Sequence, residues 1–163
     1  LEQFDKFRAS TKNIRTDLFL EICSICYLEY QKVLKENHCI DFQDMINESA
    51  DIIHKRLISR DLLDFKYIIV DEYQDISRQR YNLIRELSQL CHAKIVAVGD
   101  DWQSIYAFSG SILPLFTRFS QEVSYAQELK ITHTYRNAQE IIDIAGTFIQ
   151  KNSNQIKKRT NIT

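Results

Sequence analysis

Apolar residues recur every three or four positions over the first third of the chain, the period of an amphipathic helix. One such stretch runs from Thr16, a suitable N-cap, to about Lys35. A second runs from Asp41, which can cap it, to about Leu57. The pattern therefore predicts two successive helices before any strand.

Two later runs are short, continuously apolar and rich in β-branched residues. They occupy 67–70 and 94–98, and acidic residues follow each of them. Such runs are typical of buried strands of a parallel sheet. A helical pattern capped by Ser77 lies between them. Strands alternating with helices predict an α/β fold, a parallel sheet flanked by helices, in which ligands bind beyond the carboxyl ends of the strands.

The remaining elements are predicted with weaker patterns. We expect a short helix over 113–119, a strand over 125–131 and a helix over 138–150. The last residues, 152–163, are polar and contain the basic run Lys157-Lys158-Arg159, which is typical of a solvated tail.

Composition and charge limit the classes of protein to which this chain can belong. The 163 residues suffice for one domain, and 21 Lys and Arg against 22 Asp and Glu argue against a protein that coats DNA through overall charge. No apolar run has the length of a membrane span and no signal peptide opens the chain, so we expect no membrane partner and a cytoplasmic location. The chain begins at Leu1 and its only methionine is Met45, as expected of a piece of a longer protein.

The glycines exclude one kind of nucleotide site within these residues. Gly99, Gly110 and Gly146 are the only three, and they lie too far apart for a Walker A loop or a dinucleotide fingerprint.

The cysteines allow two interpretations. Cys23 and Cys26 form a CxxC followed by His38 and Cys39, near the spacing of some zinc sites. The helical pattern around the CxxC favours instead two thiols buried in a helix, and a reducing compartment disfavours a disulfide.

The first candidate site follows the first strand, at Asp71-Glu72-Tyr73-Gln74-Asp75. Two adjacent acids at a strand end suit nucleotide hydrolysis, in which one carboxylate holds Mg²⁺ and another positions or deprotonates water. The other interpretation is that these acids only keep a loop soluble.

Two further motifs follow in the chain. Residues 99–110 contain Gln103, which can contact a phosphate oxygen and a water, and three aromatics that could stack on bases or belong to the core: Trp102, Tyr106 and Phe108. At 134–137 an arginine stands at the predicted start of a helix, where it could stabilise charge on a transferred phosphoryl group or lie on the surface.

In this order and at these separations, DEYQD, GDDWQSIYAFSG and TYRN resemble motifs II, III and IV of the UvrD/Rep-like superfamily 1 DNA helicases. Residues 41–45 resemble the short element that precedes motif II in that family. Most relatives have Trp-Arg where this chain has Phe108 and Ser109. The Phe-Ser pair is similar to that of one subgroup of the family. The resemblance spans about Asp41 to Arg159.

The resemblance implies roles at the ATP site. Asp71 would bind Mg²⁺, Glu72 would be the general base for the attacking water, and Gln103 would sense the γ-phosphate and couple it to DNA. Tyr135 would stack on adenine, and Arg136 would contact the γ-phosphate. The implied ligands are ATP and Mg²⁺.

It also implies roles at the DNA site and between the motifs. Tyr106 and Phe108 would face single-stranded DNA, whereas Asp75 and Asp100 would tie motifs II and III together.

The family's organisation implies a partial RecA-like P-loop NTPase. Residues 1–40 would be a helical segment from the inserted helical subdomain, and 41–163 the C-terminal part of the first motor domain. The Walker A segment and the second motor domain would belong to the remainder of the parent helicase. We therefore expect a parent that couples ATP hydrolysis to 3′-to-5′ translocation and unwinding, and a chain that is inactive by itself.

Two other functions remain open on the residues alone. A metal-dependent phosphohydrolase or nuclease could use the carboxylates of Asp71, Glu72, Asp75, Asp100 and Asp101. A non-catalytic module that binds nucleic acid or protein could keep the fold without turnover.

Overall fold

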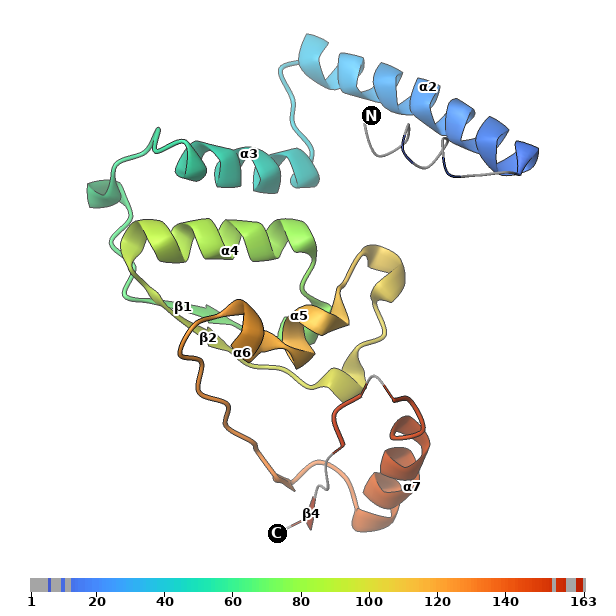
Figure 1. The fold of residues 1–163 in the computed structure, drawn as a ribbon, viewed down its shortest axis with the longest axis vertical. Helices are drawn as coiled ribbons and strands as arrows, with labels where there is room; N and C mark the ends of the chain where they lie inside the picture. The colour runs from blue at the N-terminus through green and yellow to red at the C-terminus, as the bar shows by residue number, and fades with distance from the viewer. Residues whose placement is uncertain (1–5, 7–9, 11–12, 154, 158–160, 163) are drawn as a thin grey trace. The chain divides into compact units, whose positions relative to one another are not determined.

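A computed structural model describes residues 6, 10, 13–153, 155–157 and 161–162 (Figure 1). By its internal contacts the chain divides into two units, Leu1–Met45 and Ile46–Thr163. The candidate chemistry lies in the second unit.

The first unit contains α2 (Ile14–Glu36), a helix with no buried residue. It begins earlier than predicted because the side chain of Asn13, rather than Thr16, caps it by accepting the Arg15 N–H at 3.0 Å. The CxxC thiols lie in this helix as predicted, but their predicted burial is wrong: Cys23 is half-buried and Cys26 is exposed.

α3 (Phe42–His54) begins directly after Asp41, as predicted. The Asp41 carboxylate accepts the backbone N–H of Asp44 at 2.7 Å, which satisfies a donor of the first turn. The helix ends at His54, before the predicted Leu57, and the chain then turns through Arg56 with a positive φ of 56°.

The sheet contains the two predicted strands. β1 (Tyr67–Val70) pairs in parallel with β2 (Lys94–Ala97), with Ile68 opposite Ile95 and Val70 opposite Ala97. α4 (Arg78–Cys91), capped by Ser77 as predicted, connects the strands and runs alongside them (Figure 1). Helices and a small parallel sheet make this an α/β fold, as predicted.

Only one face of this sheet is covered by the part of the chain that the structure describes. On that face Ile68 packs against a cluster around Ile53, Leu90, Cys91 and Ala93, and Val70 and Ala97 pack against a second cluster around Tyr73, Ile76, Tyr81 and Leu115. The opposite face is exposed at Tyr67, Ile69, Val96 and Val98. The prediction of strands buried on both faces is therefore wrong for one face, since no described element packs there.

After β2 the predicted short helix is divided into α5 (Leu113–Thr117) and α6 (Phe119–Glu122), because Arg118 between them leaves the helical conformation with φ −119°. The strand predicted over 125–131 is wrong: those residues have no regular structure. The strand of this region is β3 (His133–Thr134), paired in parallel with β4 (Asn161–Ile162). α7 (Gln139–Ile149) matches the predicted last helix.

The segment after α7 is not the solvated tail that the sequence predicts. Gln155 is buried, the backbone N–H of Ile156 donates to Asp101 Oδ2 at 2.6 Å, and the Trp102 indole N–H donates to the Ile156 carbonyl at 3.0 Å. The polar composition of the segment did not predict this docking, because the contacts are made by the backbone of Ile156. Lys157 is exposed, whereas Lys158 and Arg159 of the predicted basic run lie outside the described residues.

Among the helices that the structure describes, none combines the length and the apolar content that crossing a membrane requires.

Candidate functional site

The carboxyl ends of β1 and β2 bring motif II (71–75) and motif III (99–110) side by side. Beyond the paired strands, the Val98 N–H donates to the Val70 carbonyl and the Tyr73 N–H donates to the Val98 carbonyl, both at 2.9 Å. The backbone ladder therefore continues from the sheet into both motifs.

The first two acids of motif II, Asp71 and Glu72, are exposed. Asp71 Oδ1 accepts the backbone N–H of Glu72 at 2.9 Å. Glu72 has a left-handed backbone, with φ 50° and ψ 42°, a conformation that costs a non-glycine residue about 1–2 kcal/mol. Such strained residues are over-represented at functional sites.

Gln74 uses both ends of its amide, and its side chain is buried, with 1 % exposure. Its Nε2 donates to Glu72 Oε2 at 2.7 Å, and its Oε1 accepts the backbone N–H of Asp100 at 3.0 Å. Motif II and motif III are thus bonded to each other through one buried side chain.

Asp100 organises the turn of motif III. Its Oδ1 accepts the Trp102 backbone N–H at 3.1 Å, and its Oδ2 accepts Nε2 of Gln103 at 3.0 Å. A continuous chain of hydrogen bonds therefore links Glu72, Gln74, Asp100 and Gln103. We call these four residues the motif II–III relay.

Gly99 permits this approach. A Cβ at Gly99 would lie 2.6 Å from Gln74 Oε1 and 2.9 Å from Phe116 Cε2. Any larger residue would displace the relay, so the glycine is needed for close packing.

The aromatic core beneath motif II holds this turn in place. Tyr73 packs edge-on against Phe119, with ring centroids 5.5 Å apart, and lies 6.4 Å from Phe116. Burial raises the pKa of Tyr73 to about 12, so its phenol is neutral at ordinary pH.

Asp75 differs from the other acids of the site. Its backbone N–H donates to the Glu72 carbonyl at 2.9 Å, but its shielded Oδ1 has no hydrogen-bond partner among the described residues. The described contacts therefore do not connect the Asp75 carboxylate with motif III.

The aromatics of motif III divide into two kinds. Tyr106 and Phe108 form an exposed pair with ring centroids 5.9 Å apart, and Phe108 is 86 % exposed. Trp102 is half-buried and packs on α7, where a Cβ at Gly146 would meet its ring at 3.2 Å. The pair is open to a ligand, whereas the indole is part of the packing.

Motif IV (134–137) begins at the last residue of β3 and ends before α7. Tyr135 is 85 % exposed and Arg136 is also exposed, with its backbone N–H donating to Thr134 Oγ1 at 3.4 Å. Within the described ranges the Arg136 guanidinium makes no ion pair and no hydrogen bond to the relay. The structure therefore bonds Glu72, Asp100 and Gln103 into one network. None of the described hydrogen bonds or ion pairs joins the side chain of Tyr135 or Arg136 to it.

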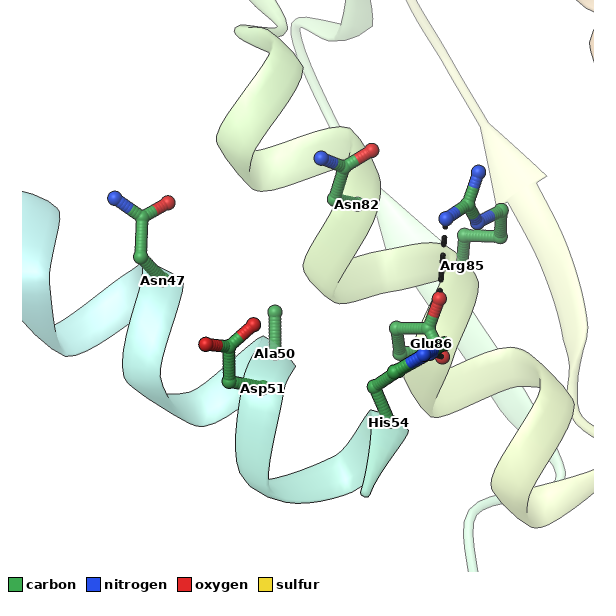
Figure 2. A pocket seen from close by; sticks show the side chains of 7 residues that line it. All are labelled: Asn47, Ala50, Asp51, His54, Asn82, Arg85 and Glu86. Carbon is green, nitrogen blue, oxygen red and sulfur yellow. Dashed lines mark hydrogen bonds and ion pairs between the residues drawn. The ribbon is translucent and has the colours of Figure 1, made fainter. Parts of the chain in front are cut away.

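A polar cavity of about 270 Å³ lies elsewhere, between α3 and α4 (Figure 2). It contains none of the predicted site residues and is lined by Asn47, Ala50, Asp51, His54, Asn82, Arg85 and Glu86.

At the edge of this cavity the buried Glu86 receives two partners, His54 Nδ1 and Arg85 Nη2, each at 3.1 Å. Burial is the largest single influence on the Glu86 pKa and raises it. The hydrogen bonds from His54 and Arg85 and the charges of these two residues together outweigh burial and hold the pKa below its ordinary value.

Two residues of the site were missed by sequence reasoning. The sequence pattern gives Gln74 no role of its own within motif II, and it offers Asp101 only as one carboxylate of a metal-dependent nuclease. Both are 1 % exposed and bind backbone N–H groups. Their position in turns after strand ends was the available signal, because buried turns need side chains that satisfy the backbone.

The described residues contain no group of three or more His, Cys, Asp and Glu side chains placed to hold a metal ion. The exposed Asp71 and Glu72 carboxylates are nevertheless hard oxygen ligands of the kind that Mg²⁺ prefers.

An α/β fold with acidic motifs at adjacent strand ends is typical of nucleotide-binding proteins. The sequence model of one protein family, the UvrD/REP helicase N-terminal domain, matches residues 2–124, and the chain belongs to this family. The resemblance to UvrD/Rep-like helicases is thereby confirmed.

Named relatives agree with this family. The chain is 34 % identical to DNA helicase IV of Escherichia coli K12 over 163 residues, covering 98 % of the chain and 23 % of that protein. It is 31 % identical over 140 residues to ATP-dependent DNA helicase PcrA of Bacillus subtilis 168, covering 85 % of the chain and 19 % of that protein. It is 30 % identical over 151 residues to ATP-dependent DNA helicase UvrD1 of Mycobacterium tuberculosis H37Rv, covering 88 % and 20 %. The chain thus spans about a fifth of the length of these relatives.

Proposed function

We propose that this chain is part of the first, RecA-like motor domain of an ATP-dependent DNA helicase. The parent protein would couple ATP hydrolysis to 3′-to-5′ translocation on single-stranded DNA and to duplex unwinding, in the cytoplasm. The observation that carries the proposal is the motif II–III relay, which connects the exposed Glu72 carboxylate with the exposed Gln103 amide. The direction of movement rests on the family resemblance.

The acids of motif II suit the hydrolytic step. Asp71 would hold Mg²⁺ through its carboxylate, and the bound ion would neutralise charge on the phosphates. Glu72 would orient the attacking water and accept its proton. Exposure of both carboxylates supports these roles, because a ligand can reach them.

Motifs III and IV would contact the γ-phosphate and the adenine ring of ATP. Gln103 would contact the γ-phosphate, and its bond to Asp100 would fix the direction of its amide. Arg136 would stabilise charge on the γ-phosphate, and Tyr135 would stack on adenine. The exposure of Tyr135 and Arg136 supports both roles.

Single-stranded DNA would bind the exposed pair of Tyr106 and Phe108. Stacking of bases on aromatic rings contributes about 1–3 kcal/mol per base and needs no particular sequence. The open faces of this pair support the role, and Trp102 is excluded from it by its packing on α7.

The remainder of the parent would complete the ATP site. Residues 1–40 would come from the inserted helical subdomain and 41–163 from the first motor domain, with Asp75 as a support of motif II. The 163 residues contain no glycine-rich phosphate loop, so a Walker A segment and a second motor domain from elsewhere in the parent would be required. The chain by itself would bind Mg·ATP weakly and would not hydrolyse it.

The test is the DNA-stimulated ATPase activity of the protein produced from its whole reading frame. We expect strong stimulation by single-stranded DNA, and a loss of about 10²–10⁴-fold in kcat for Glu72→Gln with Mg·ATP binding preserved. Glu48→Gln on α3 is the matched control, because Glu48 is also exposed and lies outside the three motifs.

The outcomes separate the hypotheses. Near-normal hydrolysis by Glu72→Gln would remove this residue from its role. DNA binding that is independent of nucleotide, in a folded protein without ATPase activity, would instead favour the non-catalytic module.

A further inference from the structure

We propose that Gln74 is a positioning residue for ATP hydrolysis, which holds the Glu72 carboxylate and transmits its state to Gln103. This inference rests on the proposed function, in which Glu72 activates water. Gln74 itself has no access to a ligand, since its side chain is 1 % exposed.

The chemistry of the amide determines its orientation. Nε2 can only donate, and it faces the Glu72 carboxylate at 2.7 Å; Oε1 can only accept, and it faces the Asp100 N–H at 3.0 Å. A flipped amide would place an acceptor against the carboxylate and a donor against an N–H. Both contacts would then be lost, so one orientation is selected.

The contact restricts a carboxylate that would otherwise rotate. Glu72 lies in an exposed turn with a left-handed backbone, and no other described side chain bonds its carboxylate. Gln74 engages Oε2, which leaves Oε1 to accept a proton from water. A general base acts efficiently only when it is held within hydrogen-bond reach of that proton.

The same side chain connects the base to the proposed phosphate sensor. Asp100, held by Gln74 through its backbone N–H, binds Gln103 through its side chain at 3.0 Å. A movement of the Gln103 side chain can therefore reach Glu72 through hydrogen bonds of two intervening residues, Asp100 and Gln74. Networks of this kind can carry coupling between two sites.

The test compares two substitutions at Gln74 in the protein from its whole reading frame. Gln74→Glu keeps an acceptor for the Asp100 N–H but loses the donor to Glu72. We expect kcat for ATP to fall by about tenfold or more at about pH 8, with KM within about twofold. Near pH 6 a protonated carboxyl at this position can donate again, so part of the loss should be recovered. Gln74→Met cannot donate at any pH and should show no recovery.

Gln89→Glu on α4 is the matched control, because it makes the same charge change at an exposed position. Its kcat should equal that of the wild type at both pH values. Wild-type kcat in folded Gln74→Met and Gln74→Glu would overturn the inference while leaving the proposed function intact.

A second measurement does not depend on activity or on tolerance of a buried change. Glu72→Ala alters an exposed residue, and its effect is followed by NMR of isotope-labelled glutamine side chains. We expect the amide resonances of Gln74 and Gln103 to shift, whereas Glu48→Ala should leave both unchanged. Unshifted resonances would overturn the relay. If Glu72→Ala shifts the resonances but the wild-type protein has no ATPase activity, the relay would be preserved and only the proposed function overturned.

Discussion

Two regions are proposed to contact the same nucleotide: the turns that follow β1 and β2, and the turn ahead of α7. They differ in how far their side chains are built into the core. The first region is bonded into the core: Gln74 and Asp101 are each 1 % exposed and hold neighbouring backbone. In the second region Tyr135 is 85 % exposed. Substitutions in the first region should therefore change stability and chemistry together, and substitutions in the second should change chemistry alone.

The largest expected effect tests the second region. Arg136→Ala should reduce the DNA-stimulated ATPase rate by about 10³-fold, as loss of a phosphate-contacting arginine does. It should change the free energy of unfolding by less than about 0.5 kcal/mol, because the side chain is exposed. The ATPase rate and the urea unfolding curve are measured on the same preparation. The exposed Arg80→Ala on α4 should leave both unchanged, and full activity in Arg136→Ala would contradict the assignment.

The next effect tests the first region through its packing. Gly99→Ala should destabilise the fold by about 3 kcal/mol, the upper end of the range for overpacking, because the new Cβ meets Gln74, Phe116 and the Tyr73 backbone. Gly110→Ala is the comparison: its φ is 89° but nothing lies within 4 Å, so strain of about 1 kcal/mol is the whole cost. Equal urea midpoints for the two variants would refute a tightly packed relay.

A smaller effect tests the contact between the first region and the segment after α7. Trp102→Phe removes the indole N–H that donates to the Ile156 carbonyl and should cost about 1 kcal/mol. Amide hydrogen exchange over 155–157 should accelerate. Phe108→Leu, at a ring with 86 % exposure, should leave this exchange unchanged. Unaltered protection in Trp102→Phe would mean that the segment is held by other contacts.

The smallest effect lies away from both regions. The folded pKa of Glu86 is below its ordinary value of 4.5, so the stabilisation that its ionised form receives is present above that pH. It is lost as the pH falls through the folded pKa. We expect a loss of about 1 kcal/mol or less, smaller still in His54→Gln, measured by urea unfolding from neutral to acid pH. Stability that rises on acidification in the wild type but not in this variant would contradict the sign.

Local patterns predicted most of the elements correctly. Ser77 and Asp41 cap the helices predicted for them, and Tyr67–Val70 forms the predicted strand. Each of these features depends on a few neighbouring residues, which is why a pattern suffices. The errors lie where the signal is short or non-local: the pairing strand β3 has two residues, and its partner β4 comes from the far end of the chain.

The candidate site divides in the same way. The sequence by itself determined which acids follow the strands. It placed Gln103, Tyr106 and Phe108 in the segment after the second strand and Arg136 at the start of a helix, and the three motifs pointed to the family. Only the tertiary structure decided that Gln74 is the bond between motifs II and III, and that Trp102 packs while Tyr106 and Phe108 stay open. It also decided that the polar segment at 155–157 docks on motif III. The physical reason is that residue type determines what a side chain can donate, accept or stack upon, whereas the partner it finds depends on which distant segments the fold brings within bonding distance.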